Sequence, residues 1–217
     1  MRSSLRSAAI RSGILALCFA VPAAGQALPA LAESPDLAPR IIGGVPSGAT
    51  ENPWQVFLLI NDRSLCGGSL ISRTWIITAA HCMKGASAAG VKAWASISAL
   101  SERSEQNRLP ASRVIVHPQY DAATLANDVA LIELSPPWVP SAGQRVIALP
   151  VAQDPATWPA AGTAATVSGW GYLGSKGPSS TVLQRAPVHV LSAPDGACGS
   201  YGPSYRPGNH LCAGENA

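Results

Sequence analysis

Short runs of apolar and β-branched residues, separated by Gly, Pro, Asn and Ser, recur along the chain from residue 55 onward. No stretch keeps the 3.6-residue period of a four-turn amphipathic helix. Many short strands at close, fairly even spacing are typical of a β-sandwich or β-barrel, not of alternating strands and helices. Examples of the expected strands are Gln55–Ile60, Trp75–Thr78, Val91–Ile97, Arg113–Val116, Val129–Leu134, Arg145–Leu149, Ala164–Ser168 and Pro187–Leu191. Short helical turns are expected at Ala79–Met83 and Asp195–Tyr201.

Residues 1–32 have the pattern of a secretory signal peptide. Arginines at positions 2, 6 and 11 precede an apolar run from Ile14 to Ala24. Ala30-Leu31-Ala32 fits a small-residue cleavage site, and Gly25-Gln26-Ala27 is an earlier alternative. The apolar run is too short to span a bilayer, so we predict a secreted protein without a membrane partner, and a retained anchor is the alternative. Residues 33–40 are polar and broken by proline, which suits an exposed peptide ahead of a folded domain at 41–217.

The charge distribution excludes one class of partner. The whole chain has 15 Lys and Arg against 12 Asp and Glu, a formal charge of +3. Residues 1–40 contain four of the basic and two of the acidic side chains, so the expected domain carries 11 against 10. It has no basic cluster and no charge run, so we expect no nucleic acid or acidic surface as its partner.

One of the five cysteines lies in the leader, which leaves four in the expected domain. An even number in an exported chain indicates two disulfides, and four cysteines allow three pairings. The pairs Cys66–Cys82 and Cys198–Cys212 would close loops of 16 and 14 residues. Each could stabilise the fold by about 3 kcal/mol in the chain-entropy account. A metal site is the alternative, but the chain has no C-x-x-C pair after the leader, and His81 beside Cys82 would be an awkward chelate, so we expect no metal.

Two motifs supply the groups that a proton relay needs. His81 ends the run Thr78-Ala79-Ala80-His81, beside a cysteine, and Asp128 opens an apolar run that continues to Ile132. A serine hydroxyl is a weak nucleophile at neutral pH, so a base must take its proton as it attacks. Imidazole titrates near neutrality and suits that role, while a carboxylate holds its tautomer and stabilises the imidazolium. We therefore identify His81 and Asp128 as candidate catalytic residues, against the alternatives of a buried histidine and a strand-start aspartate. Structural or exposed positions are expected for His117, His189 and His210.

The ordered set of motifs resembles that of secreted trypsin/chymotrypsin-type serine proteases. The matching segments are Arg40–Gly44, Asn52–Val56, Cys66–Ile71, Thr78–Cys82, His117–Tyr120, Asn127–Ile132, Ser168–Gly171 and Leu211–Gly214. The resemblance implies an all-β fold of two Greek-key, six-stranded β-barrels. It also implies a serine endopeptidase that acts on protein or peptide substrates without a cofactor. Its disulfides would be Cys66–Cys82 and Cys198–Cys212.

The junction between Arg40 and Ile41 resembles the activation site of this family. In the family, cutting after the basic residue frees an isoleucine amino group that pairs with an aspartate adjoining the nucleophile, and this ion pair forms the oxyanion hole. The resemblance implies a zymogen with residues 33–40 as its propeptide and a trypsin-like protease as its activator. An accidental Arg-Ile bond in a linker is the alternative.

The family's nucleophile motif, Gly-Asp-Ser-Gly-Gly-Pro, does not occur in the 217 residues, and neither does the G-x-S-x-G elbow of α/β-hydrolases. The settings of Ser69, Ser175 and Ser200 suit structural or surface roles, so no serine is assigned as nucleophile. We therefore expect an incomplete second barrel and no peptide hydrolysis at an enzymatic rate by these residues alone. Two hypotheses remain: a fragment of an active secreted serine endopeptidase, or a truncated, inactive homologue that acts as a binding module.

Overall fold

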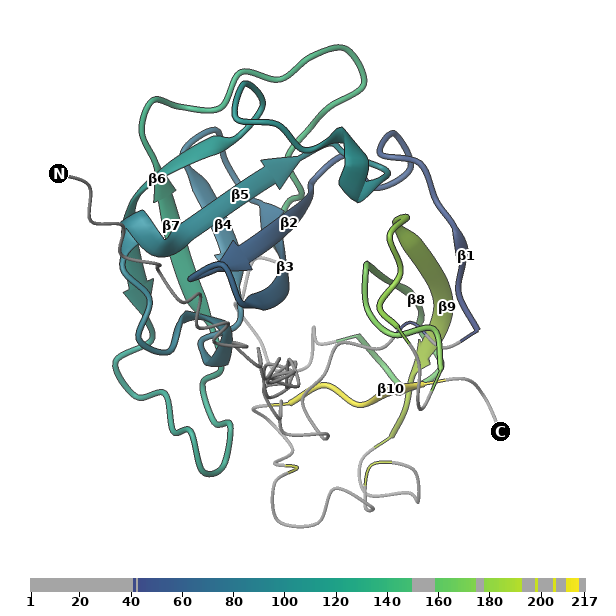
Figure 1. The fold of residues 1–217 in the computed structure, drawn as a ribbon. Coiled ribbons are helices and arrows are strands. Elements are labelled where there is room, and N and C mark those ends of the chain that lie inside the picture. The colour runs from purple at the N-terminus through teal and green to yellow at the C-terminus, as the bar shows by residue number, and fades with distance from the viewer. Residues whose placement is uncertain are drawn as a thin grey trace, which may run out of the picture. The chain divides into compact units, whose positions relative to one another are not determined.

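The computed structural model describes Ile41 and residues 43–149, 159–174, 178–192, 198, 205 and 210–214. Strands dominate this part of the chain, with three short 3-10 helices among them (Figure 1). The strands are β1 (Val45–Pro46), β2 (Gln55–Ile60), β3 (Ser64–Leu70), β4 (Trp75–Thr78), β5 (Val91–Ala95), β6 (Leu109–Val116), β7 (Ala130–Leu134), β8 (Ala164–Gly169), β9 (Gln184–Val190) and β10 (Ala213–Gly214). The 3-10 helices are η1 (His81–Met83), η2 (Ala88–Gly90) and η3 (Leu100–Glu102).

The first six long strands close into an antiparallel barrel in the order β2-β3-β4-β7-β6-β5. A tight turn joins β2 to β3, and its residues Asn61 and Asp62 have φ values of 51° and 57°. Asn and Asp enter the left-handed region more readily than other non-glycine residues, which explains their place at this turn. Closure of the barrel satisfies the backbone groups that an open sheet would leave at its edges.

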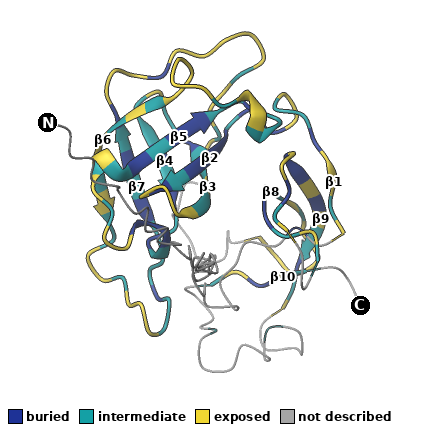
Figure 2. Cartoon of the chain, viewed as in Figure 1, coloured by how far each residue is buried: buried dark blue, intermediate teal, exposed yellow. Residues whose placement is uncertain are grey.

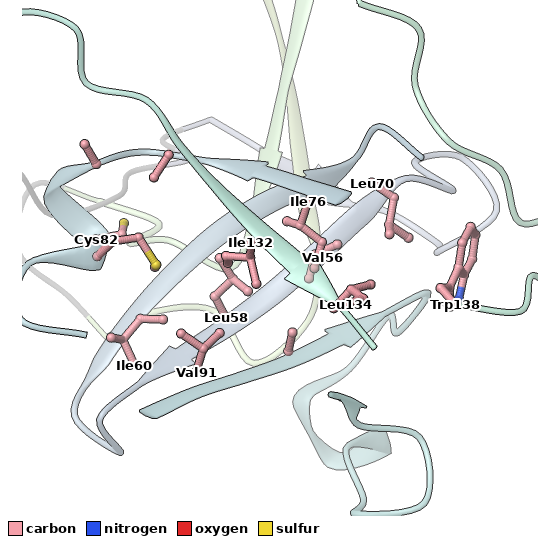
Figure 3. Close-up of a cluster of buried hydrophobic side chains, with 14 residues drawn as sticks. Val56, Leu58, Ile60, Leu70, Ile76, Cys82, Val91, Ile132, Leu134 and Trp138 are labelled. Atoms are coloured by element: carbon pink, nitrogen blue, oxygen red, sulfur yellow. The ribbon is translucent and has the colours of Figure 1, made fainter. Parts of the chain in front are cut away.

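Alternate residues of β2 fill the interior of this barrel. Val56, Leu58 and Ile60 are 0 to 2% exposed and pack with Ile76 and Ile132 from β4 and β7 (Figure 3). Buried residues lie along the barrel strands, while the tip of the connection between β6 and β7 is exposed (Figure 2). The interior is therefore a packed apolar core, and the polar chemistry is confined to the ends of the strands.

The opposite face of β2 packs on a second, aromatic cluster. Phe57 lies 6.1 Å from Trp94 and 5.5 Å from Trp170, measured between ring centroids. Trp170 and Leu183 come from the second half of the sequence and are 6% and 0% exposed. Because both faces of β2 are covered, its sequence is an almost continuous apolar run and lacks the alternation of a half-exposed strand.

The second half of the chain forms an open, antiparallel four-stranded sheet. β9 is its central strand and pairs with β1, β8 and β10. Among the described residues, β8 and β10 each pair with β9 alone. The closed barrel followed by an incomplete sheet agrees with the all-β architecture expected from the sequence.

One expected strand is wrong, and several other strands begin or end at residues other than those expected from the sequence. Residues 145–149 form no strand: Val146 and Leu149 are 37% and 51% exposed. A hydrogen bond of 2.9 Å from the Ile147 N–H to the Leu70 carbonyl joins this segment to the end of β3. The segment is apolar in sequence but is not part of a sheet. The expected turn at Ala79–Met83 is the 3-10 helix η1. The expected turn at 195–201 lies outside the described residues, except for Cys198, and so do the predicted signal peptide at 1–32 and the predicted propeptide at 33–40. Within the described ranges, the structure has no helix of the length and hydropathy that a membrane crossing requires.

Candidate active site

The pairing of β4 with β7 brings His81 and Asp128 to one edge of the barrel. Thr78, the last residue of β4, pairs with Ala130, the first residue of β7. Because the two strands are antiparallel, the chain leaving β4 and the chain entering β7 meet at the same edge. The Thr78 hydroxyl donates a hydrogen bond of 2.8 Å to the carbonyl of Gly67, which fixes the end of β4 against β3. η1 begins with His81, three residues after Thr78.

The Asp128 carboxylate holds His81 through two hydrogen bonds. Its Oδ1 accepts the backbone N–H of His81 at 2.7 Å, and its Oδ2 lies 2.7 Å from the imidazole Nδ1. A carboxylate oxygen accepts, so Nδ1 carries the proton and the neutral ring keeps a lone pair on Nε2. The side chains of His81 and Asp128 are 31% and 20% exposed, so the pair is shielded but open on one side. The arrangement suits a general base with a fixed tautomer.

Tyr120 belongs to the electrostatic environment of this pair. Burial raises the pKa of the Tyr120 phenol, and the negative charges of Asp128 and Asp121 raise that pKa further. The phenol packs against the barrel core. The sequence analysis included Tyr120 in one of the family motifs. Only the folded structure shows that the Tyr120 phenol lies within the electrostatic influence of Asp128.

The Cys66–Cys82 disulfide ties η1 to β3 beside the imidazole. Cys82 Sγ lies 3.5 Å from His81 Nε2. These three side chains bring their donor atoms within 4.8 Å of one another, a spacing that also suits a metal ion. The two sulfurs are bonded to each other, however, so this cluster is a disulfide beside a histidine and not a set of metal ligands. The second disulfide joins Cys198 to Cys212.

Ile41 is buried at the start of the described chain. Its side chain is 6% exposed, and its backbone nitrogen donates a hydrogen bond of 2.8 Å to the carbonyl of Tyr172. A Cβ atom on Gly44 would lie 2.6 Å from the Ile41 side chain, so only glycine leaves room for it there. Arg40, on the other side of the junction, lies outside the described residues.

The other histidines stand apart from the pair. His117 Nδ1 accepts the backbone N–H of Gln119 at 3.2 Å, and His189 lies within β9. His210 Nε2 is 3.1 Å from the carbonyl of Leu125, in the segment that leads to Asp128. No sequence pattern indicated this contact, because the two residues are 85 positions apart. Across the part of the chain that the structure describes, no serine hydroxyl is hydrogen-bonded to His81 Nε2.

Comparisons with known proteins agree with this geometry. The family model described as Trypsin matches residues 41–217. Human serine protease 56 (Homo sapiens) is 40% identical over 178 residues, which is 81% of this chain but only 28% of that protein. Dog serine protease 1 (Canis lupus familiaris) is 38% identical and pig trypsin (Sus scrofa) 36% identical, each over 176 residues, and the match covers 67% and 71% of their lengths.

A solved structure described as "Structure of GrC" has the same fold. Its TM-score is 0.70 at 24% sequence identity, and the match covers 81% of this chain and 76% of that one. This likeness, together with the closed barrel and the partial second sheet, confirms the fold class predicted from the sequence.

Proposed function

Because this chain belongs to the trypsin family of serine proteases, we propose that it carries the proton relay of a secreted serine endopeptidase. The observation that supports this proposal is the double hydrogen bond from Asp128 to His81, with both contacts at 2.7 Å. The substrates would be proteins or peptides. Export is supported by the leader pattern of residues 1–32 and by the two disulfides, which persist in oxidising compartments.

The roles of the two residues follow the family's established triad. With Nδ1–H donated to Asp128, the His81 Nε2 lone pair takes the proton of a serine hydroxyl as that oxygen attacks a peptide carbonyl. The imidazolium then returns the proton to the leaving amine, and Asp128 stabilises the transient positive charge. The adjacent disulfide limits the positions open to the His81 backbone, so little orientation has to be gained when a substrate binds.

Activation would follow cleavage between Arg40 and Ile41, with residues 33–40 as the propeptide and a trypsin-like protease as the activator. The burial of Ile41 supports this step, because its nitrogen already lies 2.8 Å from the Tyr172 carbonyl. A freed ammonium group at this place keeps that hydrogen bond and gains two more protons for an acidic partner. N-terminal sequencing of the active secreted protein should therefore begin at Ile41, and full activity with a start at Glu33 would contradict activation by cleavage.

The sharpest test of the function is covalent labelling with a fluorophosphonate, which modifies an activated serine. We expect labelling of the protein secreted by its natural source after activation. His81→Ala should slow it by at least about 10³-fold, because loss of the base removes serine activation. His117→Ala is the matched control, since that ring contacts the Gln119 backbone, and it should label at the wild-type rate.

The competing function is an inactive homologue that serves as a binding module. It is favoured by one observation: in the described ranges no serine hydroxyl is hydrogen-bonded to the imidazole. A folded, secreted and correctly cleaved protein that takes up no fluorophosphonate would support this alternative and overturn the endopeptidase proposal.

A further inference from the structure

We propose that His210 is a positioning residue for the His81–Asp128 pair, and that it acts through the carbonyl of Leu125. This inference rests on the proposed function, since it assigns His210 a part in keeping the relay in place. It concerns a contact between the segment that precedes β10 and the connection from β6 to β7. The argument starts from the backbone at Leu125.

Leu125 has a backbone conformation that a leucine rarely adopts. Its φ is 56°, in the left-handed region where a side chain with a Cβ meets the following carbonyl. Such conformations persist only where the surrounding structure holds them, and they gather near functional sites. Asn127 also has a φ of 56°, but asparagine tolerates this region. The segment therefore contains one position, Leu125, that needs support.

Hydrogen bonds within the segment fix its two ends. Asp121 N–H donates to the Ala126 carbonyl at 3.0 Å, and the Asp121 carboxylate accepts the Ala123 N–H and the Thr124 hydroxyl, each at 2.8 Å. Asn127 Nδ2 donates to the Gln119 carbonyl at 2.9 Å. The Ala126 N–H, in the same peptide unit as the Leu125 carbonyl, makes only a long contact of 3.4 Å to the Thr124 hydroxyl. The Leu125 carbonyl itself receives its hydrogen bond from elsewhere in the chain.

His210 supplies that contact from 85 residues further along the chain. A carbonyl can only accept, so His210 Nε2 must carry a proton and donate it to Leu125 across 3.1 Å. The neutral Nε2–H tautomer and the imidazolium both provide this donor. The ring of Tyr205 lies 6.2 Å from the His210 ring at 31°, which restrains the plane of the imidazole. The donor is thus aimed at the strained peptide in either charge state.

The orientation of the Leu125 peptide affects the relay because Asp128 lies only three residues further along the chain. Asp128 follows Leu125 at that short interval, and both of its carboxylate oxygens bind His81 at 2.7 Å. A peptide rotation at Leu125 moves the start of β7 and alters these two contacts together. Geometry errors of about 1 Å at such a site can cost about 10²-fold in rate. His210 therefore links the second half of the chain to the orientation of the base.

The test compares two replacements of His210 in the full chain. His210→Leu removes the donor at similar size, whereas His210→Gln keeps an N–H at similar reach. Amide exchange measured by mass spectrometry should be roughly fivefold faster for the peptide 119–129 in His210→Leu, because one hydrogen bond is lost. The β2 peptide 55–60 should be unchanged, and His210→Gln should restore the wild-type rate. His189→Leu, in β9, is the control and should leave peptide 119–129 unaffected.

A spectroscopic signature separates positioning from simple support of the fold. The low-field proton resonance of His81 Nδ1, identified by its loss in Asp128→Asn, should broaden or shift in His210→Leu and return in His210→Gln. Unchanged exchange and an unchanged resonance in His210→Leu would overturn the proposal. Equal damage by both replacements, or faster exchange throughout the barrel, would also overturn it. Neither amide exchange nor the proton resonance requires a nucleophile. A protein that takes up no fluorophosphonate would therefore overturn the proposed function without deciding the outcome of this test.

Discussion

At the scale of single residues, the two oxygens of Asp128 have separate tasks. One oxygen binds the His81 backbone and places the residue, and the other binds Nδ1 and selects the tautomer, each over 2.7 Å. Both bonds are to a charged acceptor, which makes them stronger than neutral hydrogen bonds. A replacement that keeps the shape of the aspartate but not its charge is therefore informative.

The charge of Asp128 should be visible at a neighbouring phenol. Burial and the Asp128 carboxylate both raise the pKa of Tyr120, so Asp128→Asn should lower that pKa while burial keeps it above its usual value. Ultraviolet titration of tyrosinate, with Tyr120→Phe to assign the signal, measures the change. Asp62→Asn, in the β2–β3 turn, is the control. An unchanged titration in Asp128→Asn would show that the aspartate does not carry its charge beside this ring.

The candidate site residues were predicted from short sequence motifs. His81 and Asp128 were predicted as candidate catalytic residues from their motifs and from the chemistry of an imidazole and a carboxylate. The pairing of β4 with β7 brings the two side chains together. The contact between His210 and Leu125 could not be predicted, since it depends on the packing of segments far apart in the chain. The relation of Tyr120 to Asp128 was missed for the same reason.

At the scale of elements, β2 contributes residues to both apolar clusters. Its residues reach the barrel interior on one face and the Phe57–Trp170 cluster on the other. The sequence predicted the bounds of β2 and β4 because their apolar runs are short and bounded by turn residues. It placed a strand at 145–149 wrongly, because hydrophobicity alone does not show whether a neighbouring strand is available.

Leu58, at the centre of this strand, is 0% exposed. Leu58→Ala leaves a cavity in the barrel core and should lower the free energy of unfolding by about 2–5 kcal/mol. Val139→Ala is the control, because that side chain is 72% exposed and its loss should change stability by less than about 0.5 kcal/mol. Denaturant unfolding measures both, and equal small effects would contradict a packed core at Leu58.

The connection between β1 and β2 is fastened to β9 by Glu51. Its carboxylate accepts the Gly48 N–H and the Ser47 hydroxyl and pairs with Arg185, and these contacts lower the Glu51 pKa below its usual 4.5. The stability that this carboxylate provides is present above pH 4.5 and is lost as pH falls through the lower folded value.

Thermal midpoints should therefore fall less between pH 5 and pH 3 in Glu51→Gln than in the wild type. Glu105→Gln, which removes an exposed ion pair with Arg108, should keep the wild-type dependence. A wild-type pH dependence in Glu51→Gln would show that the contacts to Gly48 and Ser47 do not depend on charge.

At the scale of the whole molecule, both halves of the chain provide residues around the proposed relay and the proposed activation site. The closed barrel holds His81 and Asp128, whereas the second half contributes the Tyr172 carbonyl to Ile41 and the His210 donor to Leu125. The fold class followed from the order of motifs, and the closed barrel and the open sheet agree with it. The assignment of a nucleophile did not follow, because no serine of the sequence occupies a matching motif.

The most direct measurement of the central claim is the kinetics of peptide hydrolysis by the protein as its natural source secretes it, after activation, compared with its Asp128→Asn variant. The account predicts that kcat falls by about 10⁴-fold with little change in KM, because the base loses its tautomer while the substrate contacts stay intact. Asp62→Asn, which alters an exposed ion pair with Lys92, should leave kcat unchanged. A kcat within tenfold of wild type in Asp128→Asn, or no hydrolysis by the wild-type protein, would contradict the account.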